Sequence, residues 1–280
     1  MKDGFPVADE YSEIAKKYFL PGGETGSAAT VLASLGVNVK MDGTHIGTEV
    51  ALMLNKFYGD KTVDLSSLYY DADYEGLMDY VIISGFERTP MGTFRALYES
   101  GIKRWNAPRE QDIVEASVVA IDPYFKEETL LAAELCVKHN KPYVTIDSKH
   151  GTYLSKHAAV NIVSKECLGS DYPGMPKEEA MEILKENSEG LTIITTGSND
   201  MLYARKGEPI KRMNTFKVDV KSTLGAGDTF KAGCVYGLLK GMNDDELVRF
   251  ASACSAIAIS RYPLPLFPPR IDEVNELLTL

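Results

Sequence analysis

An α/β fold with a mostly parallel central sheet is the architecture that this sequence of 280 residues predicts. Between residues 116 and 163, short apolar strands alternate with a helical pattern, and such crossovers join parallel strands. At residues 225–239, a glycine-rich turn runs directly into an apolar helix, which predicts an anion site. With 44% apolar residues, the chain can bury a substantial core.

The composition narrows the class of protein. A net charge of -10 argues against a nucleic-acid-binding surface, because phosphate binding at scale needs a basic face. The four cysteines lie in apolar segments without a Cys-x-x-Cys pair, which is typical of reduced core residues. The sequence shows no signal-peptide pattern and no apolar run of membrane length. We therefore expect a cytoplasmic protein with neither nucleic acid nor membrane as a partner.

The first part of the chain predicts few regular elements. Residues 1–20 are polar and irregular, ending in a short strand over 17–20, and no buried opening strand precedes them. A Gly-Gly turn at 22–23 leads into an Ala-rich helix to residue 36. Periodicity then predicts a strand over 37–41, a helix over 47–57 and a strand over 79–84 that turns through 85–89.

The second part supplies the sheet. Apolar runs predict strands over 116–122, 143–147, 160–163 and 191–194, with a helix over 127–137. Asp122 and Asp147 close two of these strands, where they are either ligand-facing groups or ordinary turn residues. Helices are predicted over 225–239, 244–259 and 271–280, with a rigid proline-rich stretch at 263–269.

The stretch 221–239 carries the clearest chemistry. Gly225 and Gly227 allow a tight turn and close approach to a ligand, and the helix behind them directs unpaired N–H groups at that turn. A phosphate held there would lie beside Asp228, a carboxylate suited to take a proton from an attacking hydroxyl. Local sequence alone leaves a second interpretation, an ordinary helix start capped by Asp228.

The string Ser222-Thr-Leu-Gly-Ala-Gly-Asp228 resembles the signature Asp-Thr-x-Gly-Ala-Gly-Asp of the ribokinase, or phosphofructokinase B, family of carbohydrate kinases. The resemblance implies a ribokinase-like three-layer α/β/α fold, one domain over 1–280, with a small β lid from segments near 15–22 and 79–106. It also implies ATP as cofactor, Asp228 as catalytic base and an anion hole at Gly225, Ala226 and Gly227.

Three further stretches resemble the substrate side of that family. Gly22 and Gly23 match its Gly-Gly-x-x-x-Asn motif, with Ser27 in place of the asparagine, and a serine reaches less far than an amide. Arg88 belongs to a Gly-x-x-Arg-Thr hairpin, where it faces either substrate or solvent. Asn106 matches a sugar-contacting position, although Trp105 beside it also suits a packed helix entry.

The nucleotide side is implied in the same way. Lys165 and Glu166 match the end of an Asn-x-x-Glu motif, which assigns Glu166 to Mg²⁺; the alternative is an exposed helix-start glutamate. Thr195 and Gly197 resemble a Thr-x-Gly nucleotide loop. Ser252 lies in a run that resembles the helix beside adenine, and its small neighbours equally suit close helix packing.

The predicted function is transfer of the γ-phosphoryl of ATP to a hydroxyl of a sugar or sugar-like molecule. The alternatives are a nucleoside or vitamin kinase of the same family, or a non-catalytic relative that binds nucleotide or sugar. The second is motivated by Ser27, by Ser222 and by the missing first strand, which in the family ends in a sugar-binding aspartate. We expect either a longer natural amino end or pairing of residues 1–20 in the gap, and a homodimer formed through the lid.

Overall fold

The computed structural model describes residues 5, 7–85 and 87–279, and its backbone falls into two compact units. The larger unit contains Gly23–Val39 and Ala107–Leu280, and the smaller one contains Met1–Gly22 and Lys40–Asn106. Each unit is described by itself below. Residues 1–4 of the predicted irregular stretch, with Pro6, and Phe86 of the predicted hairpin turn lie outside the described residues.

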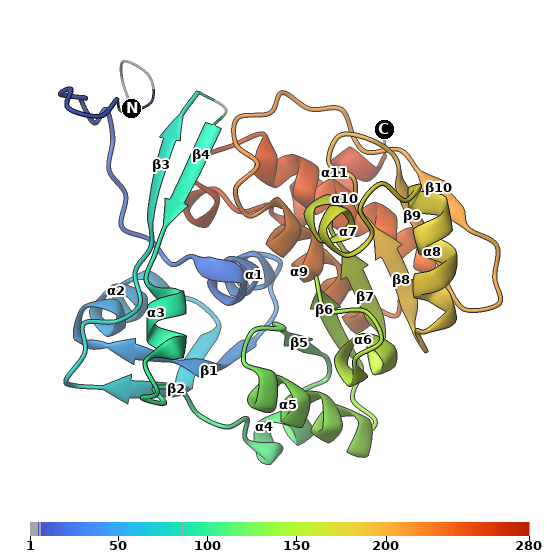
Figure 1. Cartoon of the computed structure of the whole chain (residues 1–280), viewed down its shortest axis with the longest axis horizontal. Coiled ribbons are helices and arrows are strands. Elements are labelled where there is room, and N and C mark those ends of the chain that lie inside the picture. The colour runs from blue at the N-terminus through green and yellow to red at the C-terminus, as the bar shows by residue number, and fades with distance from the viewer. Residues whose placement is uncertain (1–4, 6, 86, 280) are drawn as a thin grey trace. The chain divides into compact units, whose positions relative to one another are not determined.

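A six-stranded sheet forms the centre of the larger unit, in the order β10-β9-β8-β7-β6-β5 (Figure 1). Strands β5 to β8 are parallel, and β9 and β10 are antiparallel to their neighbours. The strands are β5 Val119–Ile121, β6 Tyr143–Ile146, β7 Val160–Val163, β8 Leu191–Ile194, β9 Met201–Ala204 and β10 Lys211–Met213. All four residues of β6, β7, β8 and β9 are buried, as expected for strands covered on both faces.

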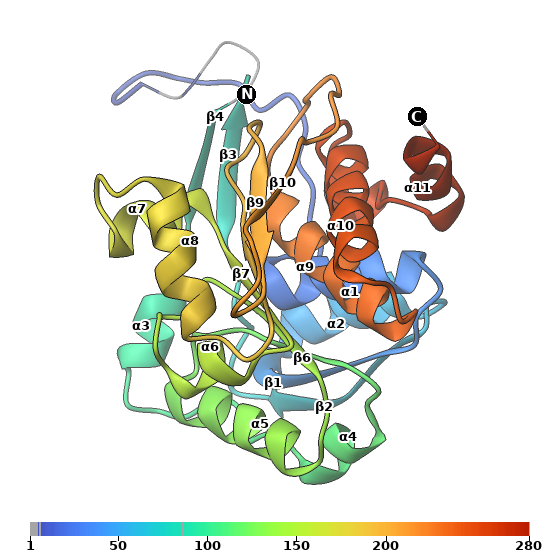
Figure 2. The same ribbon diagram turned by 90° about the vertical axis from the view of Figure 1, so that its right-hand side faces the viewer.

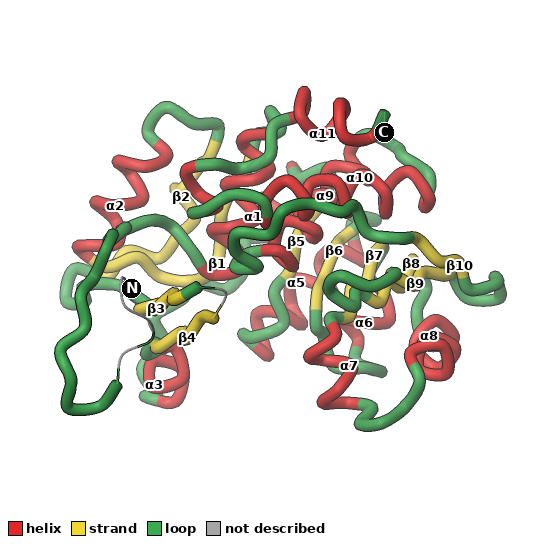
Figure 3. The backbone as a smooth tube through the Cα atoms, turned by 90° about the horizontal axis from the view of Figure 1, so that it is seen from above, coloured by secondary structure: helices red, strands yellow, loops and turns green. Residues whose placement is uncertain are grey.

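Helices cover both faces of this sheet (Figures 2 and 3). The helices on one face are α1 Gly23–Ser34, α9 Ala226–Leu239, α10 Asp244–Ile259 and α11 Ile271–Leu278. The others are α4 Glu110–Glu115, α5 Lys126–Lys138, α6 Tyr153–His157, α7 Lys165–Asp171 and α8 Lys177–Glu186. Alternate residues of one strand supply the two layers: Ile193 packs with the α9–α10 core, and Ile194 packs with the core under α8. The predicted α/β class with a mostly parallel sheet is confirmed.

Among its described residues, the smaller unit contains two two-stranded sheets and two helices. Its elements are β1 Val39–Gly47, α2 Thr48–Tyr58, β2 Val63–Asp71, β3 Tyr80–Ser84, β4 Glu87–Met91 and α3 Phe94–Glu99. Strand β1 pairs with β2, and β3 pairs with β4 in antiparallel register, with Ile83 opposite Arg88. This register confirms the predicted hairpin after residue 84.

The strand predicted over 17–20 is wrong. Residues 7–22 form neither helix nor strand, and the exposed Phe19 contributes to no ladder. A strand needs a partner that accepts and donates its backbone hydrogen bonds, and aromatic residues alone do not provide one. Among the described residues, no segment of the first 20 pairs with the sheet, so β5 is its edge.

Candidate active site at the start of helix α9

Helix α9 begins at a glycine that no other residue replaces easily. Gly225 is its N-cap in the left-handed conformation, with φ of 81°, and a Cβ there would lie 2.6 Å from Leu264 Cδ2. Left-handed backbone and close approach both favour glycine. The carbonyl of Gly225 accepts hydrogen bonds from the backbone and the hydroxyl of Thr229, at 2.9 and 2.8 Å.

The turn that follows is open to solvent. Gly227 is exposed, and Ala226 and Asp228 are partly exposed. No N-cap side chain satisfies the first N–H groups of α9, although the amide of Ala226 bonds to the carbonyl of Thr223 at 3.2 Å. A helix start of this kind presents backbone N–H groups and the positive end of the dipole to an anion.

The other predicted nucleotide-side segments follow the carboxyl ends of parallel strands. Asp147 follows β6 with φ of 53°, and its Oδ1 accepts the amide of Ser164, which follows β7, at 2.7 Å. The loop 195–200 follows β8. A Cβ on Gly227 would lie 3.3 Å from Ile146 at the end of β6, so the α9 turn lies at the same sheet edge. Ligands of open α/β sheets bind at this edge.

Helix α7 carries Lys165 and Glu166 in its first turn, and both side chains are exposed. The N-cap hydroxyl of Ser164 accepts the amide of Cys167 at 3.1 Å. Among residues 5, 7–85 and 87–279, no group of three or more His, Cys, Asp or Glu side chains forms a metal cage. A single exposed carboxylate fits an ion such as Mg²⁺ that is held mainly by water and phosphate oxygens.

The loop at Thr195 and Gly197 departs from a plain glycine loop. Gly197 has φ of 70°, and the amide of Thr195 bonds to the carbonyl of Val163 at 2.9 Å. Asp200 closes the loop through ion pairs with Lys177 at 2.5 Å and Arg212 at 2.8 Å. Hydrogen bonds from these two cations lower the pKa of the partly exposed Asp200 carboxyl. Charge pairing therefore holds the end of this loop.

Ser252 lies in α10 and is only 5% exposed. Helix α10 packs closely on α9, since a Cβ on Gly233 would lie 2.6 Å from Ala251 Cα. A nucleotide contact by Ser252 stays a prediction.

The predicted substrate residues are divided between the two units. Gly23 begins α1 with φ of 65°, and Ser27 on α1 is 7% exposed. In the smaller unit, Gly22 and Arg88 are exposed. The side-chain amide of Asn106 donates to the carbonyl of Ser67 on β2 at 2.9 Å, so that donor already has a backbone partner.

A cluster that sequence reasoning missed lies close to Asp228. The ammonium of Lys231, on α9, pairs with Asp122 after β5 and lies 4.0 Å from Glu24 Oε2 on α1. The hydroxyl of Tyr124 donates to Glu24 Oε1. Burial and the nearby Asp122 carboxylate raise the pKa of Glu24 to about 7, although the Tyr124 hydrogen bond and Lys231 act in the opposite direction. In the sequence, the sign of this cluster is Lys231 itself, a lone lysine inside the apolar run 229–239.

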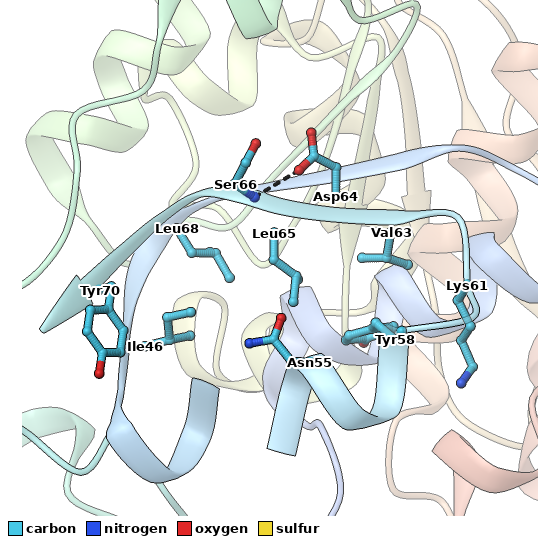
Figure 4. A pocket seen from close by; sticks show the side chains of 11 residues that line it. Ile46, Asn55, Tyr58, Lys61, Val63, Asp64, Leu65, Ser66, Leu68 and Tyr70 are labelled. Carbon is cyan, nitrogen blue, oxygen red and sulfur yellow. Dashed lines mark hydrogen bonds between the residues drawn. The ribbon is translucent and has the colours of Figure 1, made fainter. Parts of the chain in front are cut away.

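A separate hollow of about 470 Å³ lies in the smaller unit between α2 and strands β1 and β2 (Figure 4). Val63, Leu65 and Leu68 point from β2 toward α2, whereas Asp64 and Ser66 point to the other side of the strand. None of the residues predicted to bind a ligand lines this hollow.

A family model described as pfkB family carbohydrate kinase matches residues 2–264. The chain belongs to this family. The fold and the glycine-rich start of α9 are thus those of a pfkB family member, and the resemblance inferred from residues 222–228 is confirmed.

The individual relatives share low sequence identity with this chain. A 5-dehydro-2-deoxygluconokinase of Bacillus licheniformis is 24% identical over 59% of this chain, and the match spans 55% of that relative's length. A ribokinase of Bacillus subtilis is 25% identical over 93% of this chain and 88% of its own. A ribokinase of Arabidopsis thaliana, solved with ribose and ATP, superposes with a TM-score of 0.82 at 18% identity, over 99% of this chain and 93% of its own.

Among the described residues, no helix has the length and apolar character needed to cross a membrane.

Proposed function

We propose that this pfkB family member is an ATP-dependent kinase that transfers the γ-phosphoryl group of ATP to a hydroxyl of a sugar or sugar-like molecule. The start of α9 carries the proposal: a left-handed Gly225 N-cap and an open turn with Asp228 in the first helical turn. Relatives named as sugar kinases and a ribokinase solved with ATP support it.

In the proposed reaction, the Asp228 carboxylate takes the proton of the acceptor hydroxyl. The acceptor oxygen bonds to the γ-phosphorus, the bond to the bridging oxygen breaks, and ADP leaves with that electron pair. The backbone N–H groups of residues 225–228 bind the charge that grows on the phosphoryl oxygens. Bound Mg²⁺, held by Glu166 with water and phosphate oxygens, would neutralise further phosphate charge.

The proposal also includes roles for the other residues that the sequence predicts to contact nucleotide or substrate. Lys165, Thr195, Gly197 and Ser252 are proposed nucleotide contacts, and Gly22, Gly23, Ser27, Arg88 and Asn106 are proposed substrate contacts. The lid role of the segments near 15–22 and 79–106 stays a prediction. We also propose a homodimer through the smaller unit, which exposes Tyr69, Tyr70, Tyr80, Val81 and Met91.

The test is ADP release from ATP and Mg²⁺ against ketoses, aldoses, deoxy-keto acids, inositols and nucleosides, using wild type and Asp228→Asn. We expect turnover with one acceptor class and a fall in kcat of about 10²- to 10⁴-fold in Asp228→Asn, because the base is lost. The Kd for ATP should change little, because the asparagine leaves the backbone N–H groups in place.

Asp219→Asn is the matched control, since Asp219 is an exposed carboxylate whose ion pair is with Lys221. It should keep the wild-type kcat. Full activity in Asp228→Asn would contradict the role of the base. Bound ATP without turnover across the panel would favour the non-catalytic alternative.

A further inference from the structure

Lys231 is a buried cation that the proposed chemistry does not use. It lies three residues after Asp228 on α9, so the two side chains share one face of the helix. It is 1% exposed, and its nearest neighbours on α9 are the apolar Phe230 and Ala232.

Three acidic groups surround this lysine from separate elements. Asp122 follows β5, Glu24 lies in the first turn of α1, and Asp228 lies in the first turn of α9. Asp122 accepts Lys231 through Oδ1 and the Thr25 hydroxyl through Oδ2. The ammonium therefore joins segments that are far apart in the chain, since Asp122 lies 109 residues before Lys231. Asp228 lies within one helical turn of the lysine.

A gain in stability does not explain why Lys231 is paired with carboxylates in a buried position. A buried ion pair loses much solvation, and well-packed apolar residues are often equally stabilising or better. Burial alone would lower the pKa of the Lys231 ammonium, but Asp122 and Glu24 more than offset this effect and the pKa is raised. The lysine thus stays charged inside an apolar helix, next to the proposed base.

One atom of the cluster is left without a hydrogen bond. Glu24 Oε2 is buried and has no hydrogen-bond partner among the described residues, and the Lys231 ammonium at 4.0 Å is the cation it faces. The charged and titratable groups around Glu24 are Asp122 and Tyr124 from the segment after β5, and Lys231 and Asp228 from α9. Its ionisation therefore depends on whether Lys231 is present.

We propose that Lys231 is a positioning residue for phosphoryl transfer: it holds Asp122 and Glu24 in place at the start of α9 and offsets their negative charge beside Asp228. The inference rests on the proposed kinase function. Without the cation, an anionic phosphoryl group at the turn 225–228 would meet uncompensated carboxylates, and nearby carboxylates would hold their protons to higher pH.

The test is the pH profile of kcat/KM for Lys231→Met, an apolar replacement of similar length. We expect the acid limb to move to higher pH, so that the loss in kcat/KM grows as the pH falls and is largely recovered at pH 9. Well below the limb, the loss should be about tenfold for each unit by which the pKa rises. Lys185→Met is the matched control. Lys185 is also buried, at 5% exposure, and pairs with Glu182 on α8, away from the cluster. It should keep the wild-type profile even if its melting temperature falls.

A profile of Lys231→Met that superimposes on wild type, or a loss that is uniform across pH in a folded variant, would overturn the inference. A second readout needs no turnover: ¹³C NMR of glutamate side chains, with the Glu24 signal assigned by Glu24→Gln. Lys231→Met should raise the pH at which Glu24 titrates, and an unchanged titration would also overturn it. If wild type fails to turn over any acceptor, the kinase proposal fails, and the NMR result alone decides the role of Lys231 in setting this charge.

Discussion

Glu24 follows two glycines, and its carboxyl group differs from that of an exposed glutamate because of its surroundings in the fold. Burial and Asp122 raise its pKa from 4.5 to about 7. Neither cause is visible in the sequence, since Asp122 lies 98 residues away. The glycine-rich motifs, in contrast, could be predicted, because a left-handed Gly225 depends on the residue itself.

Glu24 should make the stability of the protein pH-dependent. A carboxyl with a raised pKa favours the folded state below the unfolded value of 4.5, and this contribution is lost as pH rises toward 7. The substitution Glu24→Gln removes the ionisable carboxyl group. The free energy of unfolding of wild type relative to Glu24→Gln should therefore fall by about 3 kcal/mol between pH 4.5 and pH 8 in urea titrations.

Glu134→Gln on the exposed side of α5 is the control and should differ from wild type by a constant amount. A constant difference for Glu24→Gln as well would show that the carboxyl is not perturbed.

Helices α9 and α10 show what can be predicted at the level of an element. The stretch 244–259, rich in small residues, predicts a helix, and the structure has α10 over Asp244–Ile259. Asn243 caps this helix, and Glu246 completes a capping box. The prediction of a strand at 17–20 is wrong, because a strand depends on a partner strand that the local sequence does not specify.

The close contact of α9 with α10 gives a prediction at this scale. Gly233→Ala would place a Cβ 2.6 Å from Ala251 Cα, and overpacking should cost about 1–3 kcal/mol, more than the gain in helix propensity. Gly169→Ala in α7 meets nothing within 4 Å and should be neutral or stabilising by up to about 1 kcal/mol. Thermal unfolding followed by circular dichroism compares the two. Equal melting temperatures for the two variants would contradict this prediction, because they would mean that α10 moves aside with no loss of stability.

For the whole molecule, alternating strands and helices were sufficient to predict the α/β class, and residues 222–228 were sufficient to indicate the family. The cluster at Lys231 could not be predicted, because its members come from three elements that only the complete sheet brings together. Specificity for one acceptor likewise depends on side chains assembled by the fold.

The proposed homodimer is a prediction at this scale. The chain mass is 30.8 kDa, and light scattering after gel filtration should give twice this value. Tyr80→Glu, at the exposed aromatic residue of β3, should shift the protein toward monomer because it places a charge in the apolar contact. Leu52→Glu on α2 is an exposed apolar control outside β2, β3 and β4. A wild-type mass of one chain would contradict the dimer.

The burial of Lys231 has a practical consequence for handling the protein. Amine-reactive esters attack exposed lysines, such as Lys138 and Lys206, but cannot reach an ammonium that is 1% exposed. Coupling the protein to a solid support through its lysines should therefore leave the charge beside Asp228 intact.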